Sequence, residues 1–344
     1  MSRTGKLRVV LAGCGGISGV WTNSPAVSKN CEFVGLVDIR KEAAERKAEK
    51  LGIDDIVTGT DLKEVLRATE PDIVFDVAVP EAHCGITLTA LAHGCHVLGE
   101  KPLAVSMTQA RRMAAAAEKA GRVFAVTQNY RYRMPIRALT RFIRSGAIGR
   151  ITTVYSDFFV GAHFGGFRDV MDHVLLLDMS IHTFDAARLI TGEDPVDVYC
   201  RDWNPPGSWY KDGASAAAIF NMTNDIVYSY RGSWCAEGHG TGWDSHWRII
   251  GEKGTILWDG GDGIRCQVVA GKTGFSRKTK ERTVPMKCPG YLTGGHEGVF
   301  RSFIKAVKGG PLPETDCRDN IKSLGMVLGA VKSAESGRRV NLTA

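Results

Sequence analysis

The 344-residue sequence lacks the features that mark several classes of protein. Its nine cysteines are scattered and odd in number, and no two of them form a C-x-x-C pair, so neither a disulfide framework nor a zinc-finger spacing is present. No apolar run approaches the roughly 18 residues that cross a bilayer. The N-terminal residues lead into an apolar strand without the apolar core of a secretory signal. We therefore expect a cytoplasmic protein with free thiols and no membrane partner.

A strong excess of charge is also missing, since the formal net charge is only +7. Arg133, Arg137, Arg141 and Arg144 recur at helical spacing, and we interpret them as one solvated helix face. No nucleic-acid-binding motif accompanies this stripe. The sequence therefore predicts no nucleic-acid partner.

A glycine cluster between two apolar runs is the strongest signal that is present. The run Val9–Ala12 enters Gly13, Gly15, Gly16 and Ile17, and the run Phe33–Val37 ends on Asp38. Such glycines let the backbone approach a pyrophosphate, and the acid binds a ribose diol. Ser18 stands where the third glycine of G-x-G-x-x-G is expected, and Asp38 follows it at the usual distance of about 20 residues. We predict a dinucleotide site; a tight turn in another kind of α/β protein is the alternative.

The choice of cofactor rests on two neighbouring residues. Asp38 accepts hydrogen bonds from the ribose hydroxyls of NAD and repels a 2′-phosphate, whereas Arg40 is able to pair with that phosphate. We favour NAD, and NADP stays open.

The spacing of apolar runs predicts two domains. In residues 1–127 short apolar strands alternate with helices, which predicts a Rossmann domain with a parallel, doubly wound sheet. From about Ile151 strands dominate, so residues 128–344 are expected to form an α+β domain on a large, mostly antiparallel open sheet. The expected helices span residues 41–51, 61–67, 82–93, 106–120, 178–190, 297–308 and 319–336.

Ligands of doubly wound sheets bind at the carboxyl ends of the strands. The chain segments at those ends are 13–17, 38–40, 78–83, 99–102 and 127–131. Beyond the glycine loop, Asp38 and Arg40, they supply as cofactor-binding candidates Ala78, Pro80, His83, Glu100, Lys101 and Asn129. Lys101 precedes Pro102, which fixes the backbone and places the ammonium group at a defined point of this edge. An exposed strand-end lysine is the alternative.

Asp178, His182 and Asp185 form the second candidate cluster. On a helix, positions i, i+4 and i+7 share one face. A histidine beside a carboxylate is suited to accept a proton near neutral pH. The alternative makes Asp178 a helix N-cap and His182 a half-buried structural residue. Zinc would require a third ligand that the sequence does not supply, so we predict no metal.

The chain resembles the Gfo/Idh/MocA oxidoreductases, the glucose–fructose oxidoreductase and inositol dehydrogenase family, over nearly its whole length. Two departures are Ser18 and the segment Met171–Leu175, where many members are rich in glycine. The segments that carry the resemblance are Gly13-Cys-Gly-Gly-Ile17, Val79–His83, Gly94–Pro102, Gln128–Tyr132, Ser145–Arg150, Asp178–Asp185 and Glu314–Leu324.

The resemblance implies NAD(H) or NADP(H) as cofactor, a carbohydrate-like small-molecule substrate and a homodimer or homotetramer formed through the C-terminal sheet. Lys101, Asp178 and His182 match the catalytic positions of the family, and Pro80, His83 and Glu100 match positions near the nicotinamide half. We hypothesise that His182 takes the proton of a secondary hydroxyl while Lys101 hydrogen-bonds the same oxygen and Asp178 orients the pair. The sequence leaves open which of Lys101 and His182 is the formal base.

Position along the chain suggests further substrate-binding residues, and two other functions stay open. The substrate-binding candidates are Arg131, Tyr155, His163, Arg168 and His182. The rival functions are an NAD-retaining, glycosidase-like enzyme that uses transient oxidation and a regulatory protein that binds NAD(P) without turnover.

Overall fold

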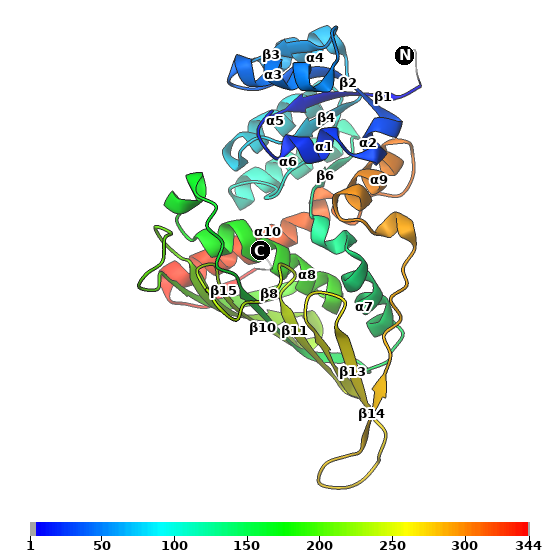
Figure 1. Ribbon diagram of the computed structural model, residues 1–344, viewed down its shortest axis with the longest axis vertical. Coiled ribbons are helices and arrows are strands. Elements are labelled where there is room, and N and C mark those ends of the chain that lie inside the picture. Colours follow the sequence, from blue (N-terminus) through cyan, green and yellow to red (C-terminus); the bar gives the residue numbers. More distant parts are fainter. Residues whose placement is uncertain (1–4, 343–344) are drawn as a thin grey trace. The chain divides into compact units, whose positions relative to one another are not determined.

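The computed structural model describes residues 5–342 and divides into two compact units (Figure 1). The first unit contains the chain up to Asn129 together with Tyr291–Ile321, and the second contains Tyr130–Gly290 and the residues from Lys322 onward. We had expected residues 128–344 to form one domain. The segment from Tyr291 belongs to the first unit because its helix packs there: the Phe300 ring lies 5.1 Å from Trp21 and 6.3 Å from Phe75.

The first unit is built on a six-stranded parallel sheet with the order β3-β2-β1-β4-β5-β6, which confirms the predicted doubly wound fold. Strand order reverses between β1 and β4, the place where such sheets bind ligands. The strands are β1 Leu7–Ala12, β2 Cys31–Val37, β3 Val57–Gly59, β4 Ile73–Asp76, β5 His96–Gly99 and β6 Phe124–Val126. The helices are α1 Ser18–Thr22, α2 Pro25–Asn30, α3 Lys41–Leu51, α4 Leu62–Thr69, α5 Pro80–Ala92, α6 Met107–Ala120 and α9 His296–Val307.

Local chemistry sets most of these boundaries. The Asp61 carboxylate accepts the N–H of Lys63 at 2.7 Å and so begins α4. Gly52 ends α3 in the left-handed conformation, with φ of 63°. The helix after the glycine loop is interrupted after Thr22, because Ser24 caps a new helix that begins at Pro25.

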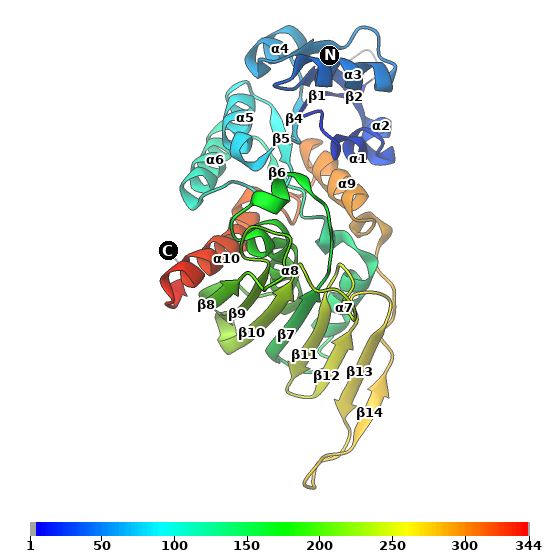
Figure 2. The same cartoon turned by 60° about the vertical axis from the view of Figure 1, so that its left-hand side comes forward.

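The second unit contains a nine-stranded sheet with the order β14-β13-β12-β11-β7-β10-β9-β8-β15 (Figure 2). Only the β7–β10 neighbours run parallel, which confirms the mostly antiparallel prediction. The strands are β7 Ile151–Phe159, β8 Pro195–Trp203, β9 Ser215–Met222, β10 Ile226–Ser233, β11 His246–Gly251, β12 Gly254–Trp258, β13 Ile264–Val269, β14 Thr279–Arg282 and β15 Val340–Asn341.

Helices cover one face of this sheet. They are α7 Met134–Arg144, α8 Ile181–Thr191 and the part of α10 (Cys317–Ser336) that lies in this unit. The Phe184 ring of α8 packs 4.8 Å from Phe220 and 5.1 Å from Tyr230, in the middle of the core. Among the described residues, no helix combines the length and the apolar character needed to cross a bilayer.

The predicted arginine stripe on α7 is only partly solvated. Arg141 and Arg144 are exposed, but Arg137 is buried, with its guanidinium 4.8 Å from the centre of the Tyr132 ring. Helical spacing had placed these residues on one face without showing that part of this face packs on aromatic rings.

Candidate functional site

The glycine loop of the first unit has the geometry of a dinucleotide cradle. Gly13 has φ of +99°, and a Cβ added there would lie 2.5 Å from the carbonyl of Val77, so only glycine fits. An added Cβ at Gly15 or Gly16 would meet no atom within 4 Å, so open space lies above the loop. Ile17 is half exposed beside it. These residues fit a pyrophosphate, which requires close approach to the backbone.

Ser18 closes the loop rather than disturbing it. Its side chain is 1% exposed, and its hydroxyl donates to the carbonyl of Gly15 at 2.6 Å. A serine at the third glycine position therefore adds a hydrogen bond that a glycine cannot make. This explains why the motif keeps its shape despite the substitution.

Asp38 follows β2 and is held by the backbone on both sides. One carboxylate oxygen accepts the N–H of Cys14 at 2.9 Å, and the other accepts the N–H of Arg40 at 3.0 Å. The Arg40 guanidinium lies 3.8 Å from the same carboxylate. The remaining lone pairs of Asp38 are suited to a ribose diol.

A buried ion pair lies further along the same edge of the sheet, and one of its two members, Asp76, is not among the residues predicted from the sequence. His83 Nδ1 lies 3.0 Å from the carboxylate of Asp76, the last residue of β4. Burial by itself lowers the pKa of His83, but the Asp76 carboxylate, with Glu100 and Glu81, outweighs burial and raises the pKa above its ordinary value. The sequence does carry a signal for Asp76, because a charged residue stands there at the end of an apolar strand.

The other predicted residues of this edge have defined places. Pro80 begins α5, directly after Ala78 and Val79. Glu100 accepts a hydrogen bond from the Trp21 indole at 3.0 Å and one from the backbone N–H of Lys101 at 3.2 Å. Lys101 is half buried and precedes Pro102 through a cis peptide bond. The side-chain nitrogen of Asn129 lies 3.3 Å from Nδ1 of the His296 imidazole.

In the second unit, Asp178 and His182 do not lie on one regular helix as expected. Asp178 is within a π-helical turn, Leu175–Ser180, and α8 begins only at Ile181. The wider π turn changes the angular spacing between the two residues. Both are nearly buried, with 6% of Asp178 and 7% of His182 exposed. A shared helix face therefore does not describe this cluster.

Each acidic residue of the cluster has an arginine partner. Arg168 Nε donates to Asp178 at 2.6 Å, and its guanidinium also lies over the rings of Phe164 and Phe167, 5.1 Å and 4.6 Å from their centres. Asp185 is fully buried and binds Arg131 through two hydrogen bonds of 2.6 Å and 2.7 Å.

An aromatic stack fixes the imidazole of His182. The Tyr130 ring lies parallel to it, 4.2 Å between centroids and 18° between planes. Arg133 covers the other face of Tyr130 at 3.6 Å and forms an ion pair with Asp244. Burial raises the pKa of the Tyr130 hydroxyl, although Arg133 opposes this, so the ring stays neutral. Sequence patterns do not indicate this stack, because Tyr130 and His182 are far apart in the chain.

The predicted substrate-binding residues other than His182 lie in four different environments. Arg168 lies beside Asp178, whereas Arg131 is 5% exposed and holds Asp185, so its guanidinium has a structural partner. Tyr155 is 46% exposed between the buried Val154 and Ser156, so it points to the face opposite the helices. His163 is exposed: its ring stacks on Trp209 at 3.7 Å, and its Nε2 lies 3.1 Å from Glu237.

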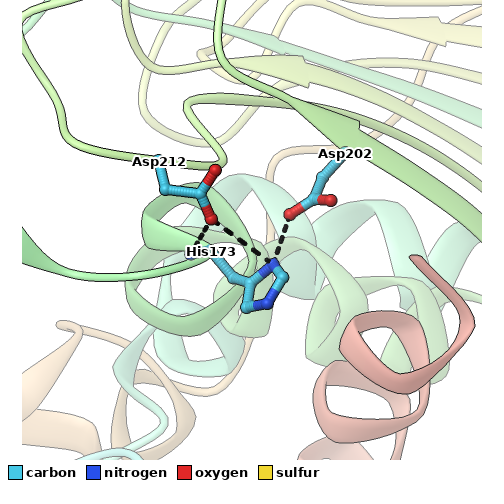
Figure 3. A group of neighbouring side chains, drawn as sticks. All are labelled: His173, Asp202 and Asp212. Atoms are coloured by element: carbon cyan, nitrogen blue, oxygen red, sulfur yellow. Dashed lines mark hydrogen bonds and ion pairs between the residues drawn. The ribbon is translucent and has the colours of Figure 1, made fainter. Parts of the chain in front are cut away.

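His173 and two carboxylates form a second cluster that the sequence did not reveal (Figure 3). His173 Nδ1 lies 2.5 Å from Asp202, and the backbone N–H of His173 donates to Asp212 at 3.3 Å. The hydrogen bond to Asp202, opposed by burial and supported by the nearby charges of Asp202, Asp212 and Glu335, raises the pKa of His173. The ligand atoms of this group are close enough to hold a metal ion. The short contact of Nδ1 with Asp202 favours an ion pair.

The parallel sheet, the glycine cradle and the acid after β2 define a dinucleotide-binding protein, and the comparisons define an oxidoreductase. Residues 7–128 match the model of an oxidoreductase family with an NAD-binding Rossmann fold, and residues 136–257 match that of the GFO/IDH/MocA C-terminal domain. The chain therefore belongs to the GFO/IDH/MocA family of NAD-dependent oxidoreductases.

Two curated relatives and one solved structure illustrate the likeness. The 1,5-anhydro-D-fructose reductase of Ensifer adhaerens is 25% identical, over 96% of this chain and 97% of its own length. The myo-inositol 2-dehydrogenase of Thermotoga maritima is 24% identical over 98% of both chains. The structure of an oxidoreductase from Agrobacterium radiobacter in complex with NAD+, L-tartaric acid and magnesium superposes with a TM-score of 0.82, at 22% identity and 98% coverage of both chains.

Proposed function

We propose that this oxidoreductase interconverts a secondary hydroxyl and a ketone on a sugar, a polyol or a sugar derivative. The observation that carries the proposal is the nearly buried His182, stacked on Tyr130, in the same unit as the Arg168–Asp178 pair. A buried imidazole with a fixed ring plane is suited to proton transfer at one defined atom. The named relatives that act on a cyclic polyol and an anhydrosugar support this substrate class.

In the proposed reaction, His182 accepts the hydroxyl proton as the carbon–oxygen bond becomes a carbonyl. Lys101 donates a hydrogen bond to the same oxygen and stabilises its developing negative charge. Asp178, held by Arg168, orients the reacting groups. The bound NAD(P) supplies the acceptor for the hydride that leaves the carbon. In the reverse direction His182 returns the proton to the alkoxide oxygen.

The first test is a screen of sugars, polyols and lactones for an absorbance change at the NADH band. With the substrate found, His182→Asn and Lys101→Met are each expected to lower kcat by about 100-fold or more, because a positioned acid–base group contributes roughly 10²–10⁴. His246→Asn, at an exposed histidine of β11, is the matched control and retains activity. If both site variants keep kcat within a few-fold of the wild type, the assignment fails.

We also propose a cytoplasmic homodimer or homotetramer that forms through the open face of the nine-stranded sheet. Large apolar side chains are exposed together there, and Tyr199 pairs directly with Ile219 across β8 and β9. The other exposed apolar residues of this face are Tyr155, Trp203 and Val227. Light scattering checks the proposal: Ile219→Lys is expected to yield monomers, and a wild-type monomer would contradict it.

A further inference from the structure

A three-layer stack in the second unit contains the imidazole of His182. The Tyr130 ring lies 4.2 Å from the imidazole, and the guanidinium of Arg133 lies 3.6 Å from the centre of the same Tyr130 ring. Arg133 directly precedes α7, and His182 is in the first turn of α8. Tyr130 is 8% exposed and His182 is 7% exposed, so water screens charges in this stack weakly. A positive charge therefore lies two layers away from the group that the proposed reaction protonates.

Asp244 holds the Arg133 guanidinium in this position. The two side chains form an ion pair that is partly buried, with 16% of the Asp244 side chain and 31% of the Arg133 side chain exposed. The next residue, Ser245, is fully buried, and its hydroxyl lies 3.2 Å from that of Thr183. Thr183 directly follows His182 in the chain. One loop therefore contacts both the arginine of the stack and the helix that carries its histidine.

The ordinary explanation for these contacts is structural, because a guanidinium over an aromatic ring stabilises a fold by itself. Two features favour a role in the reaction. A stacking contact uses the face of the imidazole rather than its nitrogens, so it fixes the ring plane in both protonation states. The ion pair is also electrically balanced, since Asp244 offsets a guanidinium charge that would oppose a positive charge on His182.

We propose that Asp244 is a positioning residue for His182, on which it acts through the other two layers of the stack. It holds the guanidinium over Tyr130, so that the stack fixes the plane of the imidazole. It also offsets the guanidinium charge, so that His182 accepts a proton more readily. This role rests on the proposed function, in which His182 is the proton acceptor. The other charged groups of the cluster are paired with one another, Arg168 with Asp178 and Arg131 with Asp185.

The first test follows the protonation of His182 in the substrate-free protein and requires no turnover. NMR spectra of protein labelled with 13C in its histidines give the pKa of each ring, and the signal of His182 is the one missing in His182→Asn. Asp244→Asn should lower the pKa of His182 by about 0.5–1 unit, because the Arg133 charge is then uncompensated. Arg133→Met should raise that pKa by a similar amount, because the Asp244 carboxylate then acts alone.

The opposite signs of these shifts separate an effect of charge from an effect of structure. Loss of a merely structural contact would loosen the stack in both variants and move the pKa of His182 in one direction. The double variant Asp244→Asn/Arg133→Met should return this pKa close to the wild-type value. Glu252→Gln and Arg150→Met are the matched controls: they make the same changes of charge in an exposed ion pair of the same unit and should leave the pKa unchanged.

The second test uses the substrate identified by the screen. Asp244→Asn should lower kcat about tenfold while KM changes less than about threefold, because the orientation of the imidazole matters for proton transfer rather than for binding. The acid limb of the kcat profile should move to lower pH in this variant, in step with the pKa of His182. Asp244→Glu keeps the charge and should hold kcat within about threefold of the wild type. Glu252→Gln should leave kcat and KM unchanged.

Failure of this role and failure of the proposed function give different results. If His182→Asn lowers kcat about 100-fold or more but Asp244→Asn behaves like Glu252→Gln in both tests, the positioning role is wrong and the proposed function stands. If His182→Asn keeps kcat, the proposed function itself fails. Shifts of the same sign in Asp244→Asn and Arg133→Met, or no shift in either, also overturn the positioning role. If Asp244→Asn fails to fold, Arg133→Met decides: a raised pKa of His182 supports the role, and an unchanged or lowered pKa rejects it.

Discussion

The cofactor cradle of the first unit and the His182 cluster of the second are built from different parts of the chain. The cradle is formed mainly by the backbone, through the conformation of Gly13, the N–H of Cys14 and the carbonyl of Gly15. The His182 cluster consists of side chains from separate segments: Tyr130 stacks on His182, which is distant in the chain, and on the nearby Arg133.

This difference determines how each site responds to substitution. A backbone site depends on conformation, so a single added methyl group is harmful while many side-chain changes are tolerated. A site of buried, paired side chains depends on each partner, because removing one leaves a charge or a polar atom buried alone.

Removal of the Arg131 side chain should have the largest effect. Arg131→Met leaves the Asp185 carboxylate buried without its arginine, although the hydroxyl of Ser323 still donates to it at 2.6 Å. Breaking a buried pair in this way costs about 3–5 kcal/mol of the free energy of unfolding. Chemical denaturation measures the change.

An exposed arginine pair provides the matched control. Arg150 Nε donates to Glu252 at 3.2 Å on the surface, so Arg150→Met should cost less than about 1 kcal/mol. Equal losses of unfolding free energy in the two variants would mean that burial gives the Arg131–Asp185 pair no additional stabilising effect. The description of the second unit as a site that depends on each buried partner would then fail.

Gly13→Ala should have the next largest effect. The effect should be on the binding of NAD+ rather than on the stability of the second unit. The new Cβ would meet the Val77 carbonyl at 2.5 Å, in a conformation that side chains rarely adopt, so the loop must move. We expect the affinity for NAD+ to fall about 100-fold, equivalent to about 2.7 kcal/mol, measured by calorimetry.

The same substitution at Gly85 is the control. Gly85 is exposed within α5, and an added Cβ meets nothing within 4 Å there. Alanine favours helix over glycine by about 1 kcal/mol, so Gly85→Ala should bind NAD+ normally and unfold at a slightly higher temperature. Normal NAD+ affinity in Gly13→Ala would refute the backbone description of the cradle.

The cradle was predictable because its requirements are local. Glycines that must approach a phosphate, and an acid at a fixed distance after them, leave a pattern in consecutive residues. Asp38 lies where that pattern placed it. Ser18 departs from the pattern. Its compensating hydrogen bond to Gly15 is evident only from the structure, because a hydroxyl can bond many different neighbours.

The second unit was predictable in outline only. Alternating apolar residues indicated strands and helices, but periodicity does not reveal the extra residue of a π turn, so Asp178 and His182 were assigned one helix face. The partners of the cluster come from distant segments: Arg131 is 54 residues from Asp185. Such pairings follow from tertiary packing, which no local pattern specifies.

The smallest predicted effect concerns the pH dependence of the His173 pair, a side-chain contact without a counterpart in the glycine loop. The groups that face His173 are Asp202, Asp212 and Glu335, and they raise its pKa in the folded protein. A raised histidine pKa stabilises the fold below the unfolded value of about 6.5, and this stability disappears as the pH rises through the folded pKa.

His173→Asn suits the positive φ of 48° at this position and removes the titrating group. We expect the wild type to exceed this variant by about 1–2 kcal/mol near pH 6, where the imidazolium pairs with ionised carboxylates, and the gap to shrink at higher pH. Urea unfolding across this pH range measures it, with His246→Asn as the exposed control. A gap that stays constant or widens with pH would show that His173 contributes by packing rather than by charge pairing.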